Sequence, residues 1–138
     1  MQISVNLINK KNDNSVILKT DSNTHSIKIS SRKSGYGSSA NGGELLFLAL
    51  AACYCNDIYR EADKLGIQVE YVEVEVKGDF DSGSSPASNI TYSAIVKAKA
   101  NRDVIIELMN LTDKVTEIQN TLRTGVPVTL VNAEAISV

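Results

Sequence analysis

Cys53 and Cys55 are the only cysteines in the chain, and they lie two residues apart at the end of the apolar run LLFLALAACYC. Cysteine thiols can pair as a disulfide, bind a metal ion, react as nucleophilic thiolates or fill a buried core. Which of these applies depends on where each side chain points, and therefore on the element that carries them.

The apolar run lies in a segment with the start and stop signals of an α-helix. Asn41 and Glu44 have the spacing of a capping box, and Gly66 is placed as a C-terminal glycine, so we predict a helix over residues 42–65. Its first half is apolar on all sides, which predicts burial all round. Residues two apart on a helix point about 200° apart, so no disulfide is expected between the two cysteines.

Neither a metal ion nor an organic cofactor is expected. Two diverging thiols cannot bind one ion together. The single histidine, His25, lies in a predicted strand without an evident set of further ligands.

The two cysteines have different surroundings on the predicted helix. Cys55 lies on an apolar stripe, which suits a packed core thiol. The stripe also contains Ala51, Ile58, Ala62 and Leu65. Cys53 lies where the helix becomes polar, with Asp57 one turn on and Arg60 two turns on. Asp57 would oppose a thiolate, and Arg60 is better placed to pair with Asp57 than to reach Cys53. Cys53 is the candidate reactive thiol, with a packed thiol as the alternative.

Strand patterns flank this helix on both sides. The segments QISVNLI, SVILKT and HSIKIS predict an N-terminal meander, and a loop rich in glycine and serine, residues 32–43, leads into the helix. VEYVEVEVKGDF and NITYSAIVKAKA predict an antiparallel hairpin. A second helix from Asn101 to Gly125 and a closing strand at residues 126–131 follow. We therefore expect an α+β fold, with antiparallel sheets and two main helices.

Length and composition predict one domain over residues 1–138. Fourteen basic residues against sixteen acidic ones leave a net charge of -2 without a basic block, so neither nucleic acid nor a membrane surface is expected as a partner. The apolar run is about half as long as a membrane span. The N-terminus lacks a secretory pattern, and we expect a cytoplasmic location, where thiols stay reduced.

The run GGELLFLALAACYCNDI, followed by ADKLGIQVEYVEVEVKGDF, resembles the signature helix and strand of the OsmC/Ohr family, and DKVTEIQNTLRTGVPVTL resembles that family's second helix and last strand. The resemblance implies an intertwined homodimer with a reactive cysteine on each central helix near the subunit interface. Family members with peroxidase activity reduce organic hydroperoxides. By the same resemblance, Cys53 matches the peroxide-attacking cysteine and Glu44 an acidic residue of the site, although Glu44 also suits a helix cap alone.

The chain departs from the family pattern in ways that bear on activity. Thr116 occupies the position of the family's resolving cysteine, and the N-terminal strands offer only Lys10 and Lys11 where the hydroperoxidases supply an arginine. A dithiol from outside could resolve an oxidised Cys53. Cys55 could do so only after local unwinding of the helix or by pairing across a dimer.

Two functions remain open from the sequence. The first is thiol-dependent reduction of small organic hydroperoxides by Cys53, with an altered resolving step that Thr116 makes necessary. The second is the binding of an apolar small molecule in a dimer cleft, with Cys53 as a packed thiol. A nearby cation, from Arg60 or the glycine-rich loop, would favour the first function because it would stabilise the thiolate.

Overall fold

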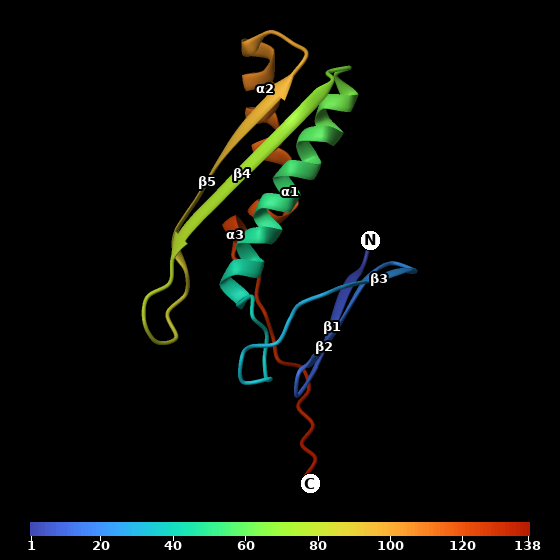
Figure 1. Ribbon diagram of the computed structural model, residues 1–138. Coiled ribbons are helices and arrows are strands. Elements are labelled where there is room, and N and C mark those ends of the chain that lie inside the picture. Colours follow the sequence, from blue (N-terminus) through green and yellow to red (C-terminus); the bar gives the residue numbers. More distant parts are fainter. The chain divides into compact units, whose positions relative to one another are not determined.

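The computed structural model describes the whole chain, Met1–Val138 (Figure 1). The chain forms two compact units, Met1–Leu46 and Phe47–Val138. Two antiparallel sheets and three helices give the expected α+β fold. The prediction of a single domain over residues 1–138 stays a prediction.

The first unit contains a three-stranded antiparallel sheet in the order β1-β2-β3. The strands are β1 (Ile3–Lys10), β2 (Asp13–Thr20) and β3 (Asn23–Ile27). Each turn between them contains a residue with positive φ, Asn12 at 62° and Asp21 at 50°. Asn and Asp adopt this left-handed conformation more readily than other residues with side chains. The predicted meander is confirmed, but its third strand begins earlier than HSIKIS and ends at Ile27, so residues 28–30 are not part of it.

The helix α1 spans Gly42–Lys64. The backbone N–H of Asn41 donates to Glu44 Oε1 at 3.0 Å, and the N–H of Glu44 donates to Asn41 Oδ1 at 2.8 Å, which confirms the capping box. At the other end Gly66 has φ of 68°, and the N–H of Ile67 donates to the carbonyl five residues back at 2.9 Å. This Schellman motif ends the helix where the glycine predicted it.

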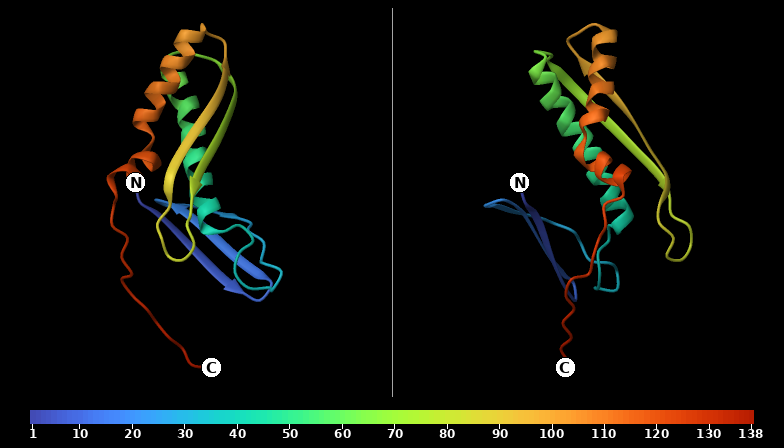
Figure 2. Two further views of the ribbon diagram at one scale, coloured as in Figure 1. Left: turned by 90° about the vertical axis from the view of Figure 1, so that its left-hand side faces the viewer. Right: turned by 180° about the vertical axis from the view of Figure 1, so that it is seen from behind.

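The second unit is built on the predicted hairpin, β4 (Val69–Asp79) with β5 (Ser88–Ala98). Figures 1 and 2 show α1 and α2 (Arg102–Val115) on the same face of this hairpin. The buried core between them comprises Tyr54, Ile58, Ala62 and Leu108. Alternate hairpin residues pack against it, among them Val72, Val74, Tyr92, Ala94 and Val96. The alternation of apolar and mostly polar residues in both strands therefore gives the sheet one face for the helices and one for solvent, and only Tyr71 and Ile95 interrupt it with exposed large side chains.

The second predicted helix is divided in two by Thr116. α2 ends at Val115, and α3 begins at Glu117 and runs to Thr124. Thr116 has an extended ψ of 116°, is fully buried, and donates from its hydroxyl to the carbonyl oxygen of Asp113 at 3.0 Å. A β-branched side chain that bonds to the backbone three residues earlier competes with continuation of the helix. The break gives the chain a further helix N-terminus in its second half.

Two further expectations are not met in the structure of the single chain. The closing strand predicted at residues 126–131 is wrong here, because the chain beyond Gly125 has no regular structure and Val128 and Leu130 are 100% and 84% exposed. A strand needs a partner edge for its backbone hydrogen bonds, and this segment has none within the chain. The apolar first half of α1 is not covered all round either, since Leu48 is 62% exposed. None of the helices combines the length and hydropathy that a membrane span requires.

Candidate functional site

Cys53 lies on α1 with its thiol partly buried and directed at the side chain one turn on. Its Sγ donates to Asp57 Oδ2 at 3.7 Å. Asp57 is itself buried, with only 5% of its surface exposed. A buried carboxylate beside a thiol stabilises the protonated thiol and opposes the thiolate.

The start of α3 has the opposite effect on the same sulfur, because it lowers the pKa of the thiol that Asp57 raises. The backbone N–H of Ile118, and to a smaller degree that of Glu117, favours the negative form of Cys53. These groups belong to the first turn of α3, where backbone N–H groups lack partners within their helix. The break at Thr116 therefore directs a helix N-terminus at the thiol.

The balance of these influences leaves Cys53 protonated at neutral pH. Burial is the largest influence and raises the pKa of the Cys53 thiol above its ordinary 9.0; the Ile118 amide lowers the pKa, and the charge of Asp57 raises it again. A thiolate is the reactive form. Backbone N–H groups that would stabilise a thiolate thus lie at Cys53, although its sulfur is protonated at neutral pH.

Arg60 pairs with carboxylates. Its Nη1 lies 3.1 Å from Asp57 Oδ1 and 3.8 Å from Glu117 Oε1, and its Nε lies 3.3 Å from Glu61 Oε1. This confirms the expected pairing with Asp57. Burial raises the pKa of Asp57, and the Arg60 guanidinium lowers it. Arg60 favours the ionised form of Asp57, and it acts on Cys53 through Asp57 and Glu117, whose charges both raise the pKa of the thiol.

The other predicted site residues have separate positions. Glu44 is held by the capping box with Asn41. Nine residues of α-helix amount to about two and a half turns, so Glu44 and Cys53 project to opposite sides of α1. Cys55 is a second free, partly buried thiol, and Thr116 is enclosed at the helix break. The structure brings Cys53 together with Asp57, and it does not bring Glu44 to the thiol.

No group of three or more His, Cys, Asp or Glu side chains has an arrangement that would hold a metal ion. His25 lies exposed on β3, opposite Leu18 of β2. It is therefore a strand residue of the first sheet.

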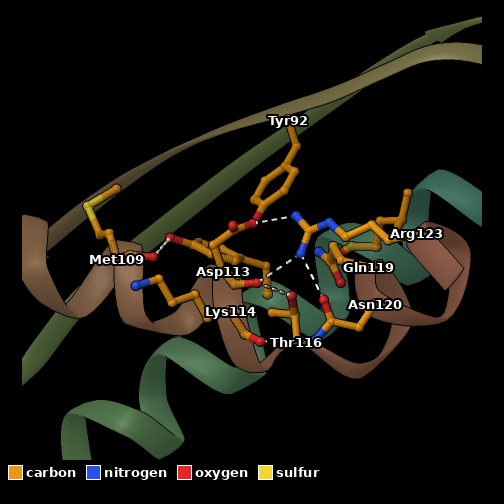
Figure 3. A network of polar contacts seen from close by, with 10 residues as sticks. Tyr92, Met109, Asp113, Lys114, Thr116, Gln119, Asn120 and Arg123 are labelled. Atoms are coloured by element: carbon orange, nitrogen blue, oxygen red, sulfur yellow. Dashed lines mark hydrogen bonds and ion pairs between the residues drawn. The ribbon is translucent and has the colours of Figure 1, made fainter.

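A polar cluster that the sequence reasoning missed holds α3 in place. In the Asp113 network, the carboxylate of Asp113 accepts hydrogen bonds from the hydroxyl of Tyr92 and from Arg123 Nη2, the latter at 2.7 Å (Figure 3). Arg123 Nη1 also donates to the carbonyl oxygen of Asp113 at 3.1 Å. In one continuous helix, Asp113 and Arg123 would lie about 15 Å apart along the axis, too far for this contact. The Asp113 network depends on the break at Thr116. The apolar periodicity of the sequence alone does not reveal that break.

Replacement of Asp57 tests the electrostatics of the site. Asp57→Asn removes a negative charge that raises the pKa of Cys53, so the pKa should fall and the thiolate fraction should increase. A fall of one unit gives tenfold more thiolate, but the thiolate becomes a weaker nucleophile, so alkylation below the pKa should accelerate about threefold. The rate at Cys53 is read by mass spectrometry after timed labelling with iodoacetamide at about pH 8. Asp63→Asn on the same helix, which is exposed, is the control and should leave the rate unchanged; an unchanged or slower rate in Asp57→Asn would contradict the assignment.

The geometry can be compared with known proteins. The sequence profile of the OsmC-like protein family matches residues 35–131. No curated protein matches the chain. Among solved structures, the fold is similar to an OsmC-like protein from Mycoplasma pneumoniae, with a TM-score of 0.67 at 15% identity over 91% of this chain and 89% of that one. An organic hydroperoxide resistance protein OsmC from Legionella pneumophila gives a TM-score of 0.57 at 17% identity, over 89% and 90% of the two chains. An OsmC-like protein of unknown function from Vibrio cholerae gives 0.57 at 14% identity, over 88% and 93%. The chain belongs to the OsmC-like protein family.

Proposed function

We propose that this protein is a thiol-dependent reductase of small organic hydroperoxides, with Cys53 as the attacking thiol. The observation that carries the proposal is the position of Cys53 between the Asp57 carboxylate and the first amides of α3. Family membership agrees with it, since similar folds include the organic hydroperoxide resistance protein of Legionella pneumophila.

The reaction begins with loss of the thiol proton. The thiol already donates to Asp57 Oδ2, which can accept that proton, while the amides of Glu117 and Ile118 stabilise the sulfur as it becomes negative. The thiolate then attacks the outer oxygen of the hydroperoxide. A sulfur–oxygen bond forms and the O–O bond breaks, which gives a sulfenic acid on Cys53 and an alkoxide that takes the proton to become an alcohol.

The second half of the cycle requires a thiol from outside, because Thr116 stands where the resolving cysteine would be. One thiol of a dithiol attacks the sulfenic sulfur and releases water, which leaves a mixed disulfide. The second thiol of the same molecule attacks that disulfide. It frees the Cys53 thiol and departs as an oxidised, cyclic disulfide. A monothiol lacks this internal second step.

Peroxide consumption by four proteins tests the proposal: wild type, Cys53→Ser, Cys55→Ser and Thr116→Cys, each with a dithiol and with a monothiol. We expect wild-type turnover at least several times faster with the dithiol than with the monothiol. Cys53→Ser should abolish turnover, and Cys55→Ser, the matched control, should keep it. Thr116→Cys, a near-isosteric change, should raise the monothiol rate towards the dithiol rate. Equal rates in wild type and Cys53→Ser would refute the proposal.

The second candidate function is binding of an apolar small molecule without chemistry at Cys53. The raised pKa of Cys53, caused chiefly by burial, favours it, because a protonated thiol is a poor nucleophile. The activity series separates the two candidates. A binding protein gives the same peroxide consumption in all four proteins, whereas a reductase loses it in Cys53→Ser alone.

We also propose that the working form is a homodimer in the cytoplasm, where thiols stay reduced. The reason to propose a dimer is the apolar surface that one chain leaves exposed. It includes Leu48 on α1 and Val128, Leu130 and Val131 in the C-terminal segment. A second copy would supply both the cover and the strand edge that residues 126–131 lack.

Sedimentation velocity at low micromolar concentration tests the dimer. The full chain should sediment with twice the 14.9 kDa mass of one chain. Removal of residues 126–138 should weaken the association, because it deletes the exposed apolar side chains of the C-terminal segment. A folded monomer of the full chain at that concentration would refute the dimer.

A further inference from the structure

Gln119 lies in the first turn of α3 and is almost completely buried. Only 4% of its surface is exposed, and its Nε2 donates to the carbonyl oxygen of Leu50 at 2.9 Å. Leu50 is on α1, three residues before Cys53, which is less than one helical turn. This hydrogen bond therefore joins the start of α3 to the part of α1 that carries the thiol.

The other side-chain hydrogen bonds that anchor α3 tie it to the end of α2. Arg123 Nη2 donates to the carboxylate of Asp113 at 2.7 Å (Figure 3). Arg123 Nη1 also donates to Asn120 Oδ1 at 2.9 Å, and Asn120 Nδ2 donates to the carbonyl oxygen of Lys114 at 3.0 Å. These bonds fix α3 relative to α2, and they do not reach α1.

An ion pair also links α3 to α1. Arg60 Nη1 lies 3.8 Å from Glu117 Oε1, and 43% and 65% of the two side chains are exposed. Exposed ion pairs contribute little because water and salt screen them. The buried bond of Gln119 is therefore the stronger link between the first turn of α3 and α1.

The Gln119 side chain carries an atom that packing for stability does not explain. Its Oε1 is buried and has no hydrogen-bond partner, the only side-chain nitrogen or oxygen in that condition in this structure. An unpaired buried amide oxygen lowers stability, and an apolar side chain of similar length would avoid that loss. Residues that break such a rule occur mostly at functional sites. The site beside Gln119 is the thiol, because its chain neighbour Ile118 directs a backbone N–H at Cys53.

We propose that Gln119 is a positioning residue for the reaction proposed at Cys53. Its bond to Leu50 holds the first amides of α3 at the sulfur, where they stabilise the negative charge that forms when the thiol loses its proton. Gln119 acts through these amides of Glu117 and Ile118. This role rests on the proposed function, because the position of the amides matters to the reaction only if Cys53 reacts as a thiolate.

Gln119→Met tests the role, because it removes the hydrogen bond while keeping an unbranched side chain of similar length. It also removes the unpaired oxygen, so the temperature of unfolding should change little. Without the bond the first amides of α3 should move away from the sulfur, and the pKa of Cys53 should rise by about one unit, which gives tenfold less thiolate. The thiolate becomes a stronger nucleophile as its pKa rises, so alkylation below the pKa should slow about threefold. The pH profile of iodoacetamide labelling at Cys53, read by mass spectrometry, gives the pKa and the rate. The charged groups around the sulfur, Asp57, Arg60 and Glu117, are the same in both proteins.

Tyr54→Phe is the matched control. It removes the hydrogen bond that the Tyr54 hydroxyl donates to the carbonyl oxygen of Met109 at 2.9 Å, which joins α1 to α2 and does not involve α3. This variant should unfold at a lower temperature, and its labelling profile should equal that of wild type. A purely structural role of Gln119 predicts the same pattern for Gln119→Met, a lower unfolding temperature with an unchanged labelling profile, and that result would overturn the proposal.

Peroxide turnover with a dithiol separates the positioning role from the proposed function. If wild type consumes peroxide and Gln119→Met labels with the wild-type profile, the positioning role is refuted and the proposed function stands. If wild type shows no turnover that needs Cys53 while Gln119→Met labels more slowly, the proposed function is refuted alone and the action of Gln119 on the thiol is supported. If Gln119→Met does not fold, the side-chain nitrogen of Gln119 in wild type decides: its 15N shift should follow the titration of Cys53, and a flat shift would overturn the proposal.

Discussion

The carboxylate of Asp113 is the contact on which the arrangement of the second unit depends. It joins three elements, because it sits on α2, accepts from Tyr92 of β5 and pairs with Arg123 of α3. The bond from Tyr92 and the charge of Arg123 hold the pKa of Asp113 below its ordinary value. Burial and the neighbouring Asp113 raise the pKa of Tyr92, so its phenol keeps the proton it donates. The Asp113 network therefore remains intact over the pH range in which thiol chemistry occurs.

Because this network holds α3 after the break at Thr116, the first amides of α3 face Cys53, and Gln119 of the same helix is buried against α1. One short helix thus serves two places. At its N-terminus it offers donors to a sulfur whose negative form Asp57 opposes, and within the same first turn Gln119 donates to the carbonyl oxygen of Leu50 on α1. Thr116 sits at the bend that makes this geometry.

Features encoded by neighbouring residues could be predicted from the sequence. The Asn41–Glu44 capping box, the glycine at the end of α1 and the pairing of Arg60 with Asp57 all involve partners within about two helical turns. The strand alternation predicted the hairpin and its buried face for the same reason. The Asp113 network and the buried oxygen of Gln119 could not be predicted, because each depends on elements brought together only by the fold. The apolar periodicity continues through Thr116 and predicted one helix, where the break at Thr116 makes two. The closing strand was wrong because residues 126–131 find no strand edge within the chain to pair with.

The first amides of α3 act on the sulfur of Cys53. The most direct test is a pH titration of the backbone 15N shifts of Glu117 and Ile118, read in carbon-detected spectra so that amide exchange does not interfere. The 13Cβ shift of Cys53 is followed alongside. The account predicts that both amide nitrogens shift with the same midpoint as Cys53 Cβ, above the ordinary thiol value of 9.0 because burial raises the pKa of Cys53, and that the shifts vanish in Cys53→Ser. Amide shifts that stay flat while Cys53 titrates, or that persist in Cys53→Ser, would contradict it.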